Sequence, residues 1–177
     1  MKVYLGLGTN LGDKAANLQA AVKLINEKIG KVTSLSSFYE TEPWGFDSKH
    51  SFLNAAAEVE TVLSPAEVLH LTQYIERELG RTKKSSGGVY SDRLIDIDIL
   101  LYDQLIIHTP ELTLPHPLMT KRDFVMMPQV EHALYNPNSG ICVSSLPNEV
   151  AVSCASKSPP NRYRISRLFS PAFPIAS

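Results

Sequence analysis

The sequence has almost no excess charge of either sign, because 17 lysine and arginine residues stand against 18 acidic ones and the net charge is −1. This balance excludes a protein that binds nucleic acid through its overall positive charge. Any affinity for phosphate must therefore come from a local cluster. Only two cysteines occur, Cys142 and Cys154, which are too few for a disulfide framework or a thiolate metal site.

Long apolar stretches are also missing. No segment approaches the roughly 18 consecutive apolar residues that a transmembrane helix needs, so we expect no membrane span. The segment Met1–Gly8 lacks the apolar region and cleavage site of a secretory signal. We therefore expect a cytosolic protein that binds neither nucleic acid nor membrane.

A chain of 177 residues can bury a core without disulfides or a structural metal. Its composition changes near the C-terminus, where serine and proline supply 13 of the last 34 residues. Glu149 is the only acidic residue in that stretch. We predict one domain over residues 1–141 and a poorly ordered tail over residues 142–177.

The periodicity of apolar residues predicts an α+β fold. Four segments are typical of strands: Val3–Gly8, Val32–Thr41, Phe52–Leu63 and Arg93–Tyr102. Apolar residues three and four positions apart predict two helices that end at Gly30 and Gly80, and a capping box at Ser64 begins the second. Leu105–Ile107 is predicted to form a hairpin with the last strand. Short connections between strands favour an antiparallel sheet over a doubly wound parallel one.

The glycine-rich segment Gly6–Gly12 lies between the first strand and the first helix. It matches neither the G-x-G-x-x-G pattern of dinucleotide-binding folds nor a phosphate-binding loop that ends in Lys-Ser or Lys-Thr. We expect these glycines to permit close backbone packing and a tight turn instead.

Two acidic residues on the last strand are the strongest candidates for chemistry. Because side chains alternate along a strand, Asp96 and Asp98 project to one face, and Ile95, Ile97 and Ile99 project to the other. Two carboxylates at this spacing repel each other unless a cation lies between them. Mg²⁺ is commonly held by one or two carboxylates together with substrate phosphates. The alternative is that both aspartates form only the solvated face of an edge strand.

A cationic segment precedes this strand. Arg81, Lys83, Lys84 and Arg93 lie within thirteen residues, and Asp92 is the only acid among them. Beside two carboxylates, such cations suit a polyphosphate–Mg²⁺ complex, because they neutralise charge on phosphoryl oxygens. For the cations alone, a solvated basic loop is the alternative.

Three other residues have two interpretations each. Phe52 and Asn54 share a strand face, where a ring and a carboxamide could bind a planar heterocycle or belong to the core. His116, between Pro115 and Pro117, could donate to a phosphate or be an ordinary loop histidine.

Five motifs, taken in order, resemble one family. They are Ser36–Gly45, Phe52–Ala56, Gly80–Arg81, Arg93-x-x-Asp96-Ile97-Asp98-Ile99-Leu100 and Pro115–Pro117. Over roughly residues 1–130 the chain is similar to the 6-hydroxymethyl-7,8-dihydropterin pyrophosphokinases of the folate pathway. The resemblance implies an α-β-α sandwich with a ferredoxin-like core, usually monomeric. It also implies transfer of the β,γ-diphosphate of ATP to the hydroxymethyl group of a reduced pterin, with release of AMP.

The resemblance further implies roles for individual residues. Asp96 and Asp98 would hold two Mg²⁺ ions, and Asp98 is the candidate for assisting removal of the hydroxyl proton. ATP contacts are implied for Gln73, Glu76, Arg81, Lys84, Arg93, His116 and Arg122. Arg81, Lys84 and Arg93 would also act in catalysis, and Gln73 and Glu76 are expected on the exposed side of the second helix. Pterin contacts are implied for Thr41, Glu42, Trp44, Gly45, Phe52, Asn54 and Phe124.

The chain departs from the family pattern at Ser91–Asp92, where many relatives carry Gly-Pro, and again after Pro128. Two other functional classes stay open from the residues alone. A non-catalytic nucleotide sensor would bind ATP without needing Mg²⁺. A nucleotidyltransferase would release pyrophosphate instead of AMP.

Overall fold

The computed structural model describes residues 1–41, 50–80 and 92–117. The predicted boundary at residue 141 and the tail after it lie outside these ranges. The same is true of seven predicted site residues: Glu42, Trp44, Gly45, Arg81, Lys84, Arg122 and Phe124.

The described chain contains two helices, and each lies in the sequence between strands of the main sheet. The helices are α1 (Lys14–Lys28) and α2 (Pro65–Glu78). The strands are β1 (Lys2–Thr9), β2 (Lys31–Leu35), β3 (Tyr39–Thr41), β4 (Phe52–Glu60), β5 (Asp96–Tyr102), β6 (Ile107–His108) and β7 (Thr113–Leu114). The predicted strand Val32–Thr41 is therefore divided into two shorter strands, β2 and β3, and both pair with β4. Neither helix has the length and apolar content that crossing a membrane requires.

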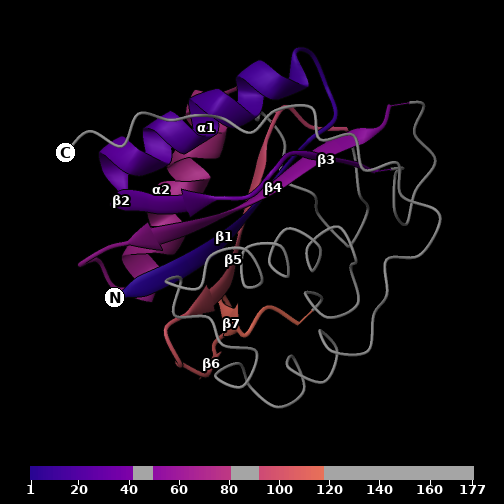
Figure 1. The fold of residues 1–177 in the computed structure, drawn as a ribbon. Coiled ribbons are helices and arrows are strands. Elements are labelled where there is room, and N and C mark those ends of the chain that lie inside the picture. Colours follow the sequence, from indigo (N-terminus) through magenta and orange to yellow (C-terminus); the bar gives the residue numbers. More distant parts are fainter. Residues whose placement is uncertain (42–49, 81–91, 118–177) are drawn as a thin grey trace.

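The main sheet has the strand order β2-β4-β1-β5, with β3 also paired to β4, and every adjacent pair is antiparallel. Helices α1 and α2 lie side by side on one face of this sheet (Figure 1). This is a ferredoxin-like arrangement, and the predicted α+β class with a mainly antiparallel sheet is confirmed. Both helices of the described residues lie on this one face, and the second helical layer of the predicted α-β-α sandwich stays a prediction.

The core lies between the sheet and the two helices. Alternate residues of β1, β4 and β5 point toward α1 and α2 and meet their apolar faces. This cluster includes Leu5, Val59, Ile97, Ile25 and Ile75. The intervening residues of the same strands belong to the opposite face, which we call the second face. It carries Gly6 and Gly8 of β1, Asn54 of β4, and Asp96 and Asp98 of β5.

Local sequence signals explain the ends of the helices. The side chain of Asp13 accepts a hydrogen bond from the Ala16 N–H and caps α1, and Ser64 and Glu67 form the predicted capping box of α2. Gly30 follows α1 where a Cβ would collide with the carbonyl oxygen of Glu60. Gly80 follows α2 with φ +97°, a conformation that favours glycine.

The predicted hairpin between Leu105–Ile107 and the last strand is wrong. Ile107 pairs with Leu114 in a separate two-stranded sheet, β6–β7. One edge of β5 is paired with β1, and on the other edge the Ile97 N–H donates to a side-chain oxygen of Glu76 at 2.8 Å. The hairpin partner is absent because the segment after β7 lies beside the end of β5, where the His116 N–H donates to the Leu100 carbonyl at 3.0 Å.

A buried carboxylate lies at the far end of the second face. Glu58 is 3% exposed and accepts hydrogen bonds from the hydroxyls of Tyr4 (2.9 Å) and Thr33 (2.8 Å), with the Lys2 ammonium 3.2 Å away. Burial raises the pKa of Tyr4 well above its usual 10.0, and the hydrogen bond to Glu58 and the charges of Glu58 and Asp103 add to the effect.

This shift predicts an alkaline loss of stability. Because the folded state holds the Tyr4 proton more tightly than the unfolded chain, the contribution is complete below pH ~10 and falls as the pH rises toward the folded pKa. Tyr4→Phe should lower the free energy of unfolding by roughly 1–2 kcal/mol at pH 8, and the deficit should shrink above pH ~10. Urea unfolding of both proteins across this range measures the difference. A deficit that stays constant with pH would contradict the coupling.

Candidate active site

Three residues lie in a row across the second face. In the antiparallel register Gly8 of β1 is opposite Asn54 of β4 on one side and opposite Asp96 of β5 on the other. Gly6 is similarly opposite Asp98. Since neighbouring strands are about 4.8 Å apart, the backbones at Asn54 and Asp96 are separated by roughly 10 Å. The register therefore places a predicted pterin-binding residue of β4 and a predicted metal ligand of β5 on the same face of the sheet, on either side of β1.

The predicted metal ligands project away from the isoleucine core, as expected. Ile95, Ile97 and Ile99 are at most 5% exposed, whereas Asp96 and Asp98 are half-buried. Arg93 Nη1 donates to Asp96 Oδ2 at 2.6 Å. A predicted phosphate-binding cation is thus in direct contact with a predicted metal ligand, which agrees with a shared site for both.

Asn10 holds the backbone that leads into β5. Its side-chain amide donates to Asp92 Oδ1 at 2.6 Å, and its side-chain oxygen accepts the Arg93 N–H at 2.8 Å. Its backbone N–H also donates to the Arg93 carbonyl at 3.2 Å. Asn10 is 2% exposed, and both of its side-chain hydrogen bonds are partly buried. The sequence patterns did not identify this residue, because its partners are more than 80 positions away.

Glu76 differs from its predicted environment. We expected it on the exposed side of α2, but it is 8% exposed and accepts the Ile97 N–H at 2.8 Å. The helix turns this side chain toward β5 because α2 packs beside that strand. Gln73, one turn earlier on α2, is half-buried. Glu76 therefore supports the backbone between Asp96 and Asp98.

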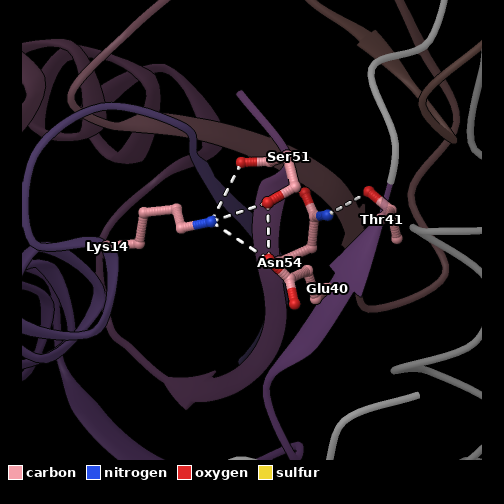
Figure 2. Close-up of polar contacts among 5 residues, drawn as sticks. All are labelled: Lys14, Glu40, Thr41, Ser51 and Asn54. Atoms are coloured by element: carbon pink, nitrogen blue, oxygen red, sulfur yellow. Dashed lines mark hydrogen bonds and ion pairs between the residues drawn. The ribbon is translucent and has the colours of Figure 1, made fainter. Parts of the chain in front are cut away.

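The predicted pterin-binding residues are joined by a hydrogen bond. Asn54 Nδ2 donates to Thr41 Oγ1 at 2.9 Å, and both side chains are buried (Figure 2). Phe52 precedes Asn54 by two residues on β4 and is half-buried. The antiparallel pairing of β3 with β4 brings these residues together, since Thr41 is opposite Phe52.

His116 lies beside β5, in the segment that follows β7. Its backbone N–H donates to the Leu100 carbonyl at 3.0 Å, so it lies beside β5 two residues beyond Asp98. Its side chain is half-buried. Of the predicted ATP contacts, the structure therefore brings Arg93, Glu76 and His116 to the last strand.

The donor set suits a hard divalent cation better than a softer metal. Within residues 1–41, 50–80 and 92–117 no group of three or more His, Cys, Asp and Glu side chains could hold a metal ion by itself. Asp96 and Asp98 offer oxygen donors alone. This fits Mg²⁺, which usually keeps several water or phosphate ligands and takes one or two carboxylates from the protein.

Comparison with known proteins identifies the family. Residues 4–134 match the family model for 7,8-dihydro-6-hydroxymethylpterin-pyrophosphokinase (HPPK). A protein of Porphyromonas gingivalis named 2-amino-4-hydroxy-6-hydroxymethyldihydropteridine pyrophosphokinase is 58% identical over 127 residues, which cover 71% of this chain and 86% of that protein. The chain belongs to the HPPK family. The predicted family and the predicted enzyme class are thus confirmed.

Other relatives of this chain have names that agree with this family. The Bacillus subtilis protein of the same name is 45% identical over 129 residues, covering 72% of this chain and 75% of that protein. A Dictyostelium discoideum relative named folic acid synthesis protein FOL1 is 43% identical over 126 residues, which cover 71% of this chain and 19% of that protein. These names confirm the predicted assignment to folate biosynthesis.

A solved structure supports the HPPK fold. The Plasmodium falciparum HPPK-DHPS with pteroate has a TM-score of 0.57 and 17% sequence identity, and the match covers 71% of this chain. Because the match spans 39% of that solved chain, it concerns only part of the larger protein.

The Asn10 contacts generate a stability prediction. Asn10→Ala removes two partly buried side-chain hydrogen bonds and leaves the Arg93 N–H without this acceptor, so it should lower the free energy of unfolding by about 2 kcal/mol. Asn26→Ala is the matched control, since Asn26 Oδ1 accepts the Val32 N–H at 3.0 Å in an exposed position. Urea unfolding should show a loss below about 1 kcal/mol for the control. Equal losses would contradict a special role for Asn10.

Proposed function

We propose that this chain transfers the β,γ-diphosphate of ATP to the hydroxymethyl oxygen of 6-hydroxymethyl-7,8-dihydropterin and releases AMP. Membership of the HPPK family supports this reaction. The structural observation that carries the proposal is the row formed by Asn54, Gly8 and Asp96. A carboxamide and a carboxylate at this spacing can hold the two reactants of a group transfer next to each other.

Phe52, Asn54 and Thr41 form the pterin end of the proposed site. An aromatic ring can stack on a planar heterocycle, and a carboxamide can both donate to and accept from the polar edge of that heterocycle. The hydrogen bond to Thr41 limits rotation of the Asn54 amide. We also propose that Glu42, Trp44, Gly45 and Phe124 complete this end.

Asp96 and Asp98 form the metal end, where we propose that two Mg²⁺ ions bind with ATP. Bound Mg²⁺ would neutralise charge on the phosphates and align them for reaction. Arg93 is a suitable phosphate ligand, because its guanidinium already lies 2.6 Å from Asp96. The remaining proposed ATP contacts are Gln73, Glu76, Arg81, Lys84, His116 and Arg122, of which Arg81 and Lys84 would also act in catalysis with Arg93.

The proposed reaction needs little covalent help from the protein. The hydroxymethyl oxygen forms a bond to the β-phosphorus, and the bond from that phosphorus to the α,β-bridging oxygen breaks and leaves AMP. The hydroxyl proton must depart, and we assign its acceptance to Asp98. Alignment of the two substrates and neutralisation of phosphoryl charge then supply most of the catalysis.

Three further expectations stay predictions: a cytosolic location, a monomeric state and a domain boundary near residue 141.

Removing either carboxylate tests the metal end. Asp96→Asn and Asp98→Asn should each lower turnover at least about 100-fold, because each loses a negative charge that binds the cation. AMP formation from ATP, Mg²⁺ and the pterin is followed by chromatography, and Mg²⁺ dependence is titrated in parallel. Formation of ADP or pyrophosphate by the wild type instead of AMP would refute the proposed reaction.

A matched control lies at the end of the same strand. Asp103 is exposed, has φ 42° and accepts the Lys2 N–H at 2.7 Å. Asn tolerates this backbone conformation and can accept the same bond. Asp103→Asn should therefore retain wild-type turnover. Melting temperatures close to the wild-type value for all three variants would exclude unfolding as the cause.

Gly8 offers a test of the pterin end. A Cβ at this position would lie 3.1 Å from Asn54 Oδ1 and would displace the carboxamide. Gly8→Ala should raise the KM for the pterin about tenfold and change the KM for ATP less than about twofold. Gly6→Ala is the control, because the three atoms nearest to its Cβ would all belong to the Leu100 side chain, the first at 3.2 Å, and not to Asn54. A pterin KM that rises equally in both variants would contradict the assignment of Asn54.

A further inference from the structure

Lys14 connects three elements next to the Asn54–Thr41 hydrogen bond. Its ammonium lies 3.2 Å from Glu40 Oε1 of β3 and donates to Ser51 Oγ at 2.8 Å and to the Ser51 carbonyl at 3.2 Å. The Ser51 hydroxyl in turn donates to Glu40 Oε1 at 2.5 Å. We call Lys14, Glu40 and Ser51 the Lys14 junction (Figure 2).

The position of Lys14 at the start of α1 does not favour a positive charge. Lys14 is the first residue of α1, and the first turn contains no acidic residue. A cation at a helix N-terminus is unfavourable, because the exposed backbone N–H groups give that end a partial positive charge. The favourable electrostatic contribution of Lys14 therefore comes from the Lys14 junction, not from the helix.

The Lys14 junction adds a restraint to the short strand β3. β3 has three residues and, in the part of the chain that the structure describes, pairs only with β4. Glu40 is opposite Leu53, a core residue, so Glu40 belongs to the face that α1 covers. Thr41 and Asn54 belong to the second face. The ammonium thus links β3 to the residue before β4 on the face of the sheet opposite to the Asn54–Thr41 pair.

The ion pair is also partly shielded from solvent. The side chains of Lys14 and Glu40 are 28% and 33% exposed, whereas the Lys23–Glu27 pair on the same helix is 75% and 51% exposed. Exposed pairs contribute little to stability, and shielding with additional hydrogen bonds strengthens such contacts. The two pairs therefore provide a comparison within one helix.

We propose that Lys14 is a positioning residue for the pterin, acting through Glu40 and Ser51 on the alignment of Thr41 with Asn54. This inference rests on the proposed function and adds a residue that contacts neither substrate. The proposed ATP site is at β5, on the other side of β1, so loss of the ammonium should affect pterin binding selectively.

Lys14→Met tests this inference, since methionine keeps the aliphatic stem and removes the charge. AMP formation by the full chain is measured with each substrate varied in turn, and pterin binding is measured separately by calorimetry. We expect the KM and the dissociation constant for 6-hydroxymethyl-7,8-dihydropterin to rise about tenfold, with kcat and the KM for ATP changed less than about twofold. Lys14→Arg should retain pterin affinity because it keeps the charge.

Lys23→Met is the matched control, because it removes an exposed cation from the same helix. It should behave as the wild type. A pterin KM in Lys14→Met within about twofold of the wild-type value would overturn the inference. So would an equal rise of both KM values together with a lower melting temperature, which would indicate a purely structural role. A wild-type protein that forms no AMP from ATP and the pterin would instead refute the proposed function itself.

Discussion

The antiparallel pairing of β1 with both β4 and β5 is the constraint on which the candidate site depends. It brings Asn54 and Asp96 to opposite sides of Gly8. The central strand must carry small residues there, because a Cβ on Gly8 would crowd the Asn54 amide and one on Gly6 would crowd Leu100. The glycines therefore leave room for side chains from the flanking strands to approach each other. Their role in packing agrees with the sequence prediction.

Local patterns were sufficient to predict most of the elements and the orientation of the acidic pair. Helix caps depend on residues three or four positions apart, and strand alternation alone separates Asp96 and Asp98 from the isoleucines. The α+β class followed from the short connections between strands. These features could be predicted because each depends on neighbours in the sequence, whose geometry is set by the regular backbone.

Features that depend on distant partners could not be predicted in this way. The order of strands in the sheet decides which edge of β5 is available, and so it decides both the failed hairpin and the burial of Glu76. Glu76 was expected to be exposed because helical periodicity describes the helix, not the strand edge beside it. Asn10 and Lys14 were missed for the same reason. Asn10 lies in the segment before α1 and Lys14 in its first turn, and neither position indicates the distant residues that they contact.

Asp92 illustrates how one of these distant contacts can replace a local restraint. We noted from the sequence that many relatives carry proline at this position, and a proline ring restricts the backbone by itself. Aspartate has no such ring, but its carboxylate accepts a hydrogen bond from Asn10, which also binds the backbone of Arg93 on both its N–H and carbonyl groups. The direction of Arg93 toward Asp96 is then set by a tertiary contact. An unusual residue before the signature arginine is therefore compatible with an ordered approach to β5.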